Sequence, residues 1–342
     1  MSTTDAPCPP LAVTIGEPAG VSGEITVKAW QSCREDRGVA FFALADPAYL
    51  RDTAKHLGIE VEIAEIHDPA EAHTRFRDKL PVLPLDATMS VKLGEPGIGN
   101  AKAVIESIRR SVEVCASGSA SGVVTNPIHK KTLYEGGFAF PGHTEFIADL
   151  CGVDAPVMML ASPELRVVPV TVHLPLKQAI DRLSSDLIVA TATITEQALK
   201  QDFAIDRPRL AISGLNPHAG EGGTLGEEDG TIIADAIGRL IAAGIDVIGP
   251  VPGDALFTPS SRPTFDAAIC MYHDQALIPI KALDFDRAVN TTLGLPIVRT
   301  SPDHGTAFDI AGSGSANPSS LIASIRLAAE ISAARRRTGV KA

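Results

Sequence analysis

Short apolar runs rich in β-branched residues alternate with longer segments of helical periodicity along most of this chain. Residues 11–15 form such a run and residues 25–31 a helix-like segment, and the pattern repeats at 39–44 and 48–57. Strands that alternate with helices form parallel sheets, because each helix returns the chain to the start of the next strand. We therefore predict an α/β fold with a mainly parallel sheet. Further strands are predicted at residues 122–125, 157–161, 167–172, 210–214, 247–249 and 267–271, and further helices at 184–201, 230–243 and 319–337.

The length of the chain indicates more than one folded body. Its 342 residues exceed what one compact core usually holds, so we expect two lobes with a ligand cleft between them. The sequence shows no internal repeat, low-complexity tract or long linker that would mark the lobe boundary.

Charge and cysteine content exclude several classes of protein. The chain has 41 acidic and 30 basic side chains, a formal charge of -11, so we expect no nucleic-acid partner. Its five cysteines include no CxxC pair, which argues against a disulfide framework and for a reducing compartment. The chain has no apolar run of about 18 residues and no signal-peptide pattern at its start, so we expect a cytoplasmic protein with no membrane partner.

Three of the predicted strands run into a histidine. The segments are VVPVTVHLPL with His173, LAISGLNPHAG with His218 and AAICMYHDQAL with His273. The carboxyl ends of parallel strands lie along one edge of a sheet, where ligands bind. Three imidazoles gathered there suit Zn, Co, Ni or Fe and leave coordination positions for a substrate. In the alternative, each is an ordinary loop histidine with a backbone hydrogen bond. Asp274 is a candidate to orient His273 or to add a carboxylate near the site.

The segment FPGHTEF, residues 140–146, has the form of a turn that enters a helix. Free N–H groups at a helix start, together with His143 and the Thr144 hydroxyl, are predicted to hold an anion such as a phosphate. In the alternative, Thr144 only caps its own helix. Further polar candidates, Lys281, Asn290 and Arg299, occur at or near later strand ends.

A glycine-rich turn follows the first predicted strand. Its glycines, Gly16, Gly20 and Gly23, have the spacing GxxxGxxG, whereas the dinucleotide-binding fingerprint is GxGxxG. Glu17 also places a carboxylate where a pyrophosphate would lie. We therefore interpret this segment as a tight strand-to-helix turn that lines the cleft.

The segment DHGTAFDIAG, residues 303–312, resembles the adenosine-binding loop of the isopropylmalate and isocitrate dehydrogenase superfamily. Those enzymes are metal-dependent and use NAD or NADP without a Rossmann fold. The resemblance implies that His304, Gly305, Thr306 and Asp309 bind the cofactor. The Asp309 carboxylate would accept hydrogen bonds from the adenosine ribose and repel the extra phosphate of NADP, so NAD is the expected cofactor.

Other motifs narrow the resemblance to the 4-hydroxythreonine-4-phosphate dehydrogenase family of pyridoxal phosphate (vitamin B6) biosynthesis. They are GEPAG, TNPIHK, FPGHTEF, HLPL, GLNPHAGEGG, MYHDQ and NTTLGLPIVRTSPDHGTA, and they extend from about residue 11 to about residue 330. The resemblance implies one divalent ion, with zinc, cobalt and magnesium as candidates, bound by His173, His218 and His273. The implied substrate contacts are His143, Thr144, Lys281, Asn290 and Arg299.

The same resemblance implies a two-lobed isocitrate/isopropylmalate dehydrogenase-like fold with the active site in the cleft. The first lobe would comprise residues 1–135 and 285–342, and the second, residues 136–284, would carry the metal site and the dimer interface. The protein would be a homodimer whose active sites are each completed by the partner chain. The chain departs from the family in having VSGE after GEPAG, where IGPE is usual.

The implied reaction is the NAD-dependent oxidation of 4-phosphooxy-L-threonine to 2-amino-3-oxo-4-phosphooxybutanoate, which loses CO2 to give 3-amino-2-oxopropyl phosphate. Lys281, Asp254 and Asp274 are candidates for the base. One alternative is a paralogous dehydrogenase of D-threonate or erythronate 4-phosphate, although TNPIHK, where some paralogues have TAPxNK, favours the first substrate. More remote alternatives are a metal-dependent aldolase or hydrolase and a non-catalytic binding protein.

Overall fold

The computed structural model of the chain describes residues 8–339 and divides into two compact units. Unit 1 comprises residues up to Pro156 and from Leu295 onward, and unit 2 comprises Val157–Gly294. This division differs from the predicted lobes at residues 136–156, which belong to unit 1, and at residues 285–294, which belong to unit 2. Helix α6 (His143–Leu150) belongs to unit 1 because it packs against α4 (Ala101–Ala116), and strand β11 (Val289–Leu293) belongs to unit 2 because it pairs with β6 (Val157–Ala161).

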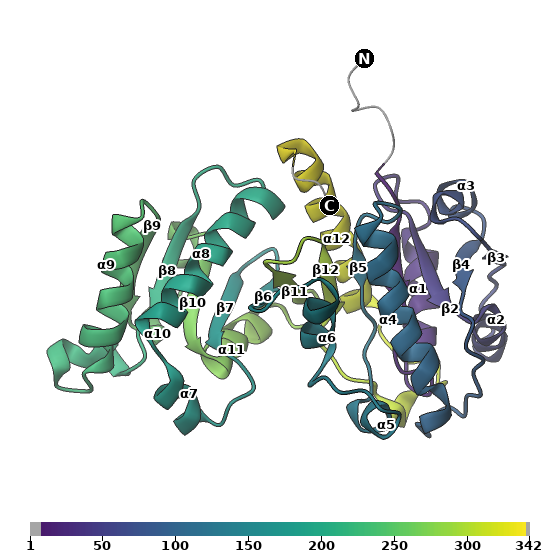
Figure 1. The fold of residues 1–342 in the computed structure, drawn as a ribbon, viewed down its shortest axis with the longest axis horizontal. Helices are drawn as coiled ribbons and strands as arrows, with labels where there is room; N and C mark the ends of the chain where they lie inside the picture. Colours follow the sequence, from purple (N-terminus) through teal and green to yellow (C-terminus); the bar gives the residue numbers. More distant parts are fainter. Residues whose placement is uncertain (1–7, 340–342) are drawn as a thin grey trace, which may run out of the picture. The chain divides into compact units, whose positions relative to one another are not determined.

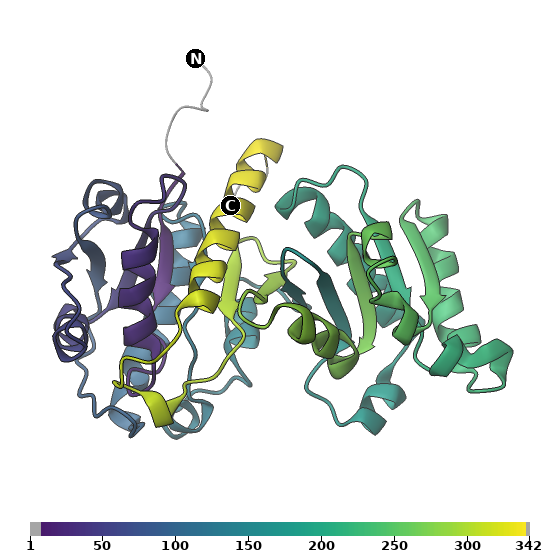
Figure 2. The ribbon, with the colours of Figure 1, turned by 180° about the vertical axis from the view of Figure 1, so that it is seen from behind.

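Unit 1 is built on six parallel strands in the order β3-β4-β2-β1-β5-β12. Helix α4 covers one face of this sheet, and helices α1 and α12 lie together on the other (Figures 1 and 2). The strands are β1 (Leu11–Thr14), β2 (Phe41–Ala45), β3 (Ile63–Glu65), β4 (Leu80–Pro84), β5 (Val123–Val124) and β12 (Arg299–Pro302). The helices are α1 (Ser22–Cys33), α2 (Pro47–His56), α3 (Ala72–Arg75), α4, α5 (Lys130–Glu135), α6 and α12 (Ser319–Thr338), with short 3-10 turns η1 (Pro69–Glu71), η2 (Ile98–Asn100) and η6 (Phe308–Ile310).

Unit 2 has the strand order β11-β6-β7-β10-β8-β9, in which β7, β10, β8 and β9 are parallel and β6 is antiparallel to both its neighbours. Helices α8 and α11 both pack on the central strands, α8 toward the viewer in Figure 1 and α11 in Figure 2. The remaining strands are β7 (Arg166–Thr171), β8 (Arg209–Ser213), β9 (Asp246–Val251) and β10 (Ala267–Tyr272). The helices are α7 (Leu176–Arg182), α8 (Ser185–Asp202), α9 (Ala234–Ala242), α10 (Gly253–Leu256) and α11 (His273–Asp284). The unit also has an irregular turn η3 (Pro217–Gly223), a π-helical turn η4 (Asp229–Ile233) and a 3-10 turn η5 (Arg262–Thr264).

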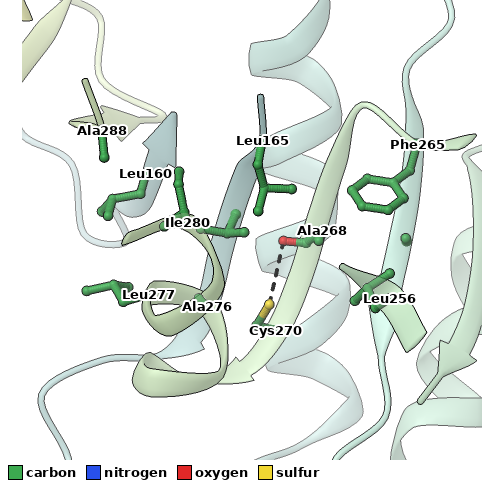
Figure 3. Close-up of a cluster of buried hydrophobic side chains, with 12 residues drawn as sticks. Leu160, Leu165, Leu256, Phe265, Ala268, Cys270, Ala276, Leu277, Ile280 and Ala288 are labelled. Carbon is green, nitrogen blue, oxygen red and sulfur yellow. Dashed lines mark hydrogen bonds between the residues drawn. The ribbon is translucent and has the colours of Figure 1, made fainter. Parts of the chain in front are cut away.

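Apolar packing fixes helix α11 on the sheet of unit 2. Ala276, Leu277 and Ile280 of α11 lie in a buried cluster with Leu160 of β6 and Cys270 of β10 (Figure 3). Because α11 starts at the residue after β10, this packing also fixes where His273 lies.

The predicted α/β architecture with mainly parallel strands is confirmed. Strand β6 occupies the predicted residues 157–161, and most other predicted strands and helices are displaced by one to three residues at their ends. Strands β3, β4, β11 and β12 and helix α4 were not predicted. Within the described part of the chain, no helix is long and apolar enough to cross a membrane.

Candidate active site

The three strand-end histidines all lie at one edge of the sheet in unit 2. Strands β7, β10 and β8 are adjacent and parallel, so the residues that follow them emerge at the same edge. His173 follows β7 and His273 follows β10, and their ring centroids are 5.7 Å apart. Both line a cavity of about 290 Å³, together with Tyr272 and Asp274.

His218 follows β8 but lies in a different cavity. That cavity, of about 630 Å³, is lined by His218, Asp254, Asp274 and Tyr272 among others. Asp274 and Tyr272 therefore border both cavities. Among residues 8–339, no three His, Cys, Asp or Glu side chains converge closely enough to form a metal site within one chain. The structure thus brings two of the three predicted metal ligands together and leaves the third in the adjacent cavity.

The chemistry of the paired histidines fits a divalent metal. The His273 Nδ1 and an Asp274 carboxylate oxygen are 2.8 Å apart, so the ring donates its Nδ1–H to the carboxylate and keeps Nε2 as a lone-pair donor. A carboxylate–histidine pair of this kind orients many metal-binding imidazoles. His173 and His218 have φ angles of 52° and 53°, in the left-handed region that side chains other than glycine rarely adopt. Such backbone geometry concentrates at ligand-binding positions.

Two other predicted residues of unit 2 lie away from the carboxyl ends of β7, β10 and β8, since Asn290 pairs with Leu160 of β6, which pairs with Val167 near the start of β7. Lys281 is on α11, with its ammonium 5.8 Å from the ring centroid of Phe285. Asn290 is on β11, and its Oδ1 is buried with no hydrogen-bond partner among the described residues. Of the base candidates, Asp254 is exposed and Asp274 is engaged with His273. The identity of the base stays a prediction.

Unit 1 gathers a separate group of cationic and polar side chains around Arg299. This residue starts β12 and is only 3% exposed, and its guanidinium donates to the Thr125 hydroxyl at 2.9 Å. Burial lowers the pKa of Arg299 to about 10, so the side chain remains charged at neutral pH. A buried cation of this kind favours an anionic ligand.

His143, at the start of α6, is an imidazole on which this cation acts. The positive charges of Arg299 and Lys130 act on His143, whose Nε2 is buried with no hydrogen-bond partner among the described residues. Gly142 is the N-cap of α6 and no side-chain hydrogen bond caps the helix, so Thr144 does not act as its cap. The pair of His143 and Arg299 suits an anion such as a phosphate or carboxylate, and the role of Thr144 stays a prediction.

We expect His143 to make folding sensitive to acid. Burial, followed by the charges of Arg299 and Lys130, holds the pKa of His143 well below its usual value. The unfolded chain takes up a proton at this residue near pH 6.5, whereas the folded chain stays neutral, so stability is lost as the pH falls below 6.5. At pH 5.5 the expected loss from this residue is about 1 kcal/mol. Urea unfolding at pH 8 and pH 5.5 should show a smaller decline in the His143→Gln variant, and an equal decline in both proteins would contradict the assignment.

The glycine-rich turn after β1 supports the loop that was predicted to bind adenosine. A Cβ atom at Gly20 would lie 2.4 Å from the Thr306 carbonyl oxygen, and the backbone N–H of Val21 donates to that oxygen at 3.0 Å. Glu17 is 2% exposed and accepts hydrogen bonds from the Ala19 N–H and the Thr132 hydroxyl, and burial raises its pKa. These contacts make the turn a support for the loop at residues 303–312.

Three residues that sequence analysis did not identify hold this loop and the residues just after it. Lys28 donates to the carbonyls of Gly314 and Ala316 at 2.7 and 2.9 Å, and Glu24 accepts from the Ala316 N–H at 2.9 Å. His56 bonds the Gly312 carbonyl through Nε2 at 3.0 Å. The spacing of Glu24 and Lys28 on one helix face indicates an ion pair, but nothing in the sequence connects that pair to a loop nearly 290 residues away.

The loop itself offers polar groups for a nucleotide. Asp309 and Gly305 are exposed, and the Nε2 atom of His304 is buried without a hydrogen-bond partner among the described residues. Ala307 has a φ of 46°, a further left-handed residue in this short segment. An exposed carboxylate beside exposed backbone groups fits the hydroxyl groups of a ribose.

The relatives of this α/β chain place it among the dehydrogenases. A solved terephthalate 1,2-cis-dihydrodiol dehydrogenase from Burkholderia xenovorans LB400 is 27% identical with a TM-score of 0.64, covering 94% of this chain and 98% of that one. The family described as pyridoxal phosphate biosynthetic protein PdxA matches residues 38–328, and the chain belongs to this family.

Named relatives agree with this assignment and confirm the resemblance found in the motifs. A 4-hydroxythreonine-4-phosphate dehydrogenase from Bradyrhizobium diazoefficiens is 51% identical over 338 residues, covering 95% of this chain and 98% of the relative. The crystal structure of the enzyme of that name from Klebsiella pneumoniae is 34% identical with a TM-score of 0.85, covering 94% of this chain and 99% of that chain. The protein is thus an oxidoreductase of pyridoxal phosphate biosynthesis.

Proposed function

We propose that this protein oxidises the C3 hydroxyl of 4-phosphooxy-L-threonine with NAD to give 2-amino-3-oxo-4-phosphooxybutanoate. The hydroxyl proton passes to a protein base and the hydride from C3 to the nicotinamide. The bond between C2 and the carboxylate then breaks, its electron pair passes into the ketone as an enolate, and C2 takes up a proton as CO2 and 3-amino-2-oxopropyl phosphate are released. The observation that carries the proposal is the pair of imidazoles, His173 and His273, at a sheet edge of a chain whose relatives bear this enzyme's name.

His173, His218 and His273 are the proposed ligands of one divalent ion, zinc, cobalt or magnesium. When bound, the metal stabilises negative charge on a substrate oxygen, and NAD accepts the hydride. The pairing of His273 with Asp274 supports this role, because it leaves Nε2 available as a donor. Lys281, Asp254 and Asp274 remain the candidates for the base that takes the hydroxyl proton.

Arg299, His143 and Thr144 are proposed to bind the substrate phosphate, and Lys281 and Asn290 its other polar groups. A neutral His143 donates one hydrogen bond without adding charge, whereas Arg299 supplies a buried positive charge. The buried Nε2 of His143 and Oδ1 of Asn290 have no partners among the described residues, which supports contact with a ligand.

We further propose that the protein is a homodimer with shared metal sites. His218 and the pair formed by His173 and His273 line different cavities within one chain, so a second copy would be needed to complete three ligands. Two large apolar side chains that line these cavities are exposed, Ile278 at 66% and Leu176 at 56%. An apolar surface of this kind suits contact with a second copy.

The experiment that tests the activity is NADH formation with a panel of phosphorylated substrates. The purified protein is assayed with 4-phosphooxy-L-threonine, D-threonate 4-phosphate and erythronate 4-phosphate, each with and without a chelator. We expect chelator-sensitive NADH formation that is fastest with the first substrate. Faster turnover of either sugar acid phosphate would show that this compound is the substrate. NADH formation that is unaffected by the chelator would contradict the proposed metal requirement.

Cofactor choice is predicted to depend on Asp309. Exchanging its exposed carboxylate for the ammonium of Asp309→Lys removes repulsion of the NADP phosphate and adds attraction. We expect the NAD-to-NADP ratio of kcat/KM to fall about 100-fold, about 3 kcal/mol, measured by varying each cofactor at saturating substrate. Asp303→Lys, six residues earlier, serves as a charge-matched control. An unchanged ratio in Asp309→Lys would show that another residue selects the cofactor.

A further inference from the structure

The turn that carries His218 has an unusual backbone. Six consecutive residues, 218–223, have positive φ angles between 41° and 94°, and three of them, His218, Ala219 and Glu221, are not glycine. Left-handed conformation is unfavourable for residues with a Cβ atom and normally occurs at single positions. Because a run of this length is strained, contacts from outside the turn must hold it in place.

A buried carboxylate supplies those contacts. Asp229, 1% exposed and the first residue of η4, accepts hydrogen bonds from the backbone N–H of Leu215 at 2.8 Å and of Asn216 at 3.1 Å. It also accepts a bond from the Asn216 side-chain amide at 2.9 Å, and that amide donates to Glu228 at 2.8 Å. Both backbone groups lie within three residues of His218, so the carboxylate fixes the chain where the left-handed run begins.

The glycines around this carboxylate show how closely it is packed. A Cβ atom at Gly214 would lie 2.9 Å from an Asp229 carboxylate oxygen and 2.9 Å from the Ala219 Cβ. A Cβ atom at Gly226 would lie 2.4 Å from the Asn216 side-chain nitrogen. The chain thus packs closely around Asp229 and Asn216, and the two backbone N–H groups take their acceptor from Asp229.

We propose that Asp229 is a positioning residue that holds His218 in the orientation required to bind the metal. The proposal rests on the metal-binding role assigned to His218 under the proposed function. Without the carboxylate, the N–H groups of Leu215 and Asn216 lose their acceptor and the turn relaxes toward right-handed geometry. The imidazole of His218 remains in the protein but no longer points where the other ligands require it.

The test is the affinity of the full-length protein for Co2+, measured by calorimetry and by the visible absorption of the bound ion. We expect Asp229→Asn to bind Co2+ about 10- to 100-fold more weakly, the range typical of residues that orient metal ligands. Excess Co2+ should restore most activity in Asp229→Asn, because all three histidines are present, and should not restore it in His218→Ala. Hydrogen exchange at the amides of Leu215 and Asn216 should accelerate. The affinity for NAD should not change.

Asp266→Asn is the matched control. Asp266 accepts a hydrogen bond from the Arg209 N–H at 2.8 Å at the opposite end of β8, so its loss affects stability without reaching the turn. Its Co2+ affinity should equal that of the wild type. If Asp229→Asn does not fold, Asp229→Glu keeps the charge but displaces the carboxylate from the backbone N–H groups of Leu215 and Asn216, and should also weaken Co2+ binding.

The outcomes separate this proposal from the function on which it rests. Wild-type Co2+ affinity in a folded Asp229→Asn or Asp229→Glu variant, with weak binding in His218→Ala, would reject the positioning role of Asp229 and leave the metal role of His218 in place. Wild-type Co2+ affinity in His218→Ala would show that His218 is not a metal ligand, and the positioning role of Asp229 would then be rejected as well.

Discussion

Mixing two inactive variants, His218→Ala and His273→Ala, is expected to restore activity. Each variant alone should lose at least about 1,000-fold in kcat, about 4 kcal/mol, because a site with two ligands holds the ion too weakly to stabilise charge on the substrate. His218 lines one cavity of the chain, and His273 lines another with His173. If each site takes His218 and His273 from different copies, one of the two sites in every mixed dimer contains all three histidines.

The size of the recovery is itself a prediction. Random exchange of subunits makes half of the dimers mixed, so about a quarter of the wild-type sites should be regained. The measurement is NADH formation after the two variants are co-incubated under conditions that exchange subunits, with the bound metal counted in parallel. A mixture of wild-type and His73→Ala proteins, the latter altered at an exposed histidine of α3, controls for the exchange procedure. No recovery in the mixed dimers would show that His218 and His273 act within the same chain.

Replacing Arg299 by methionine is expected to abolish recognition of the phosphate. The guanidinium is almost wholly buried and charged at neutral pH, so loss of its charge-assisted bonds to a phosphate should lower kcat/KM about 100-fold, about 3 kcal/mol. Arg299→Lys should recover only part of the lost kcat/KM, because an ammonium cannot form the bidentate hydrogen bonds that a guanidinium makes to a phosphate.

The substrate comparison identifies which group Arg299 binds. Assays with 4-phosphooxy-L-threonine and with 4-hydroxy-L-threonine should show that the loss is confined to the phosphorylated compound. Arg335→Met provides a matched control, because Arg335 is a second buried arginine of unit 1 that donates to the carbonyls of Leu295 and Pro296. This control should lose stability and keep the wild-type ratio between the two substrates. An equal loss on both substrates in Arg299→Met would assign the arginine to the carboxylate or to structure.

Much of this protein was predictable from local patterns. The alternation of β-branched runs with amphipathic segments determined the α/β class, because the period of apolar residues reflects which face of each element is buried. The positions of His173, His218 and His273 just after predicted strands were enough to place them at one edge of a parallel sheet. The long helix α4 was not predicted, although residues such as Val104, Ile108 and Val112 mark its buried face at helical spacing.

The pairing of side chains from distant segments was decided only by the tertiary structure. Nothing near His273 in the sequence indicates that its ring meets His173 and not His218, because that choice depends on how the turns after β7 and β8 leave the sheet. The turn after β8 is left-handed because the carboxylate of Asp229, eleven residues after His218, accepts the N–H groups that precede it. Likewise, the unusually low pKa of His143 arises from burial beside Arg299, which is 156 residues away. Local sequence determines which elements form and which residues end them, whereas long-range packing determines which of those residues meet and how strongly each is desolvated.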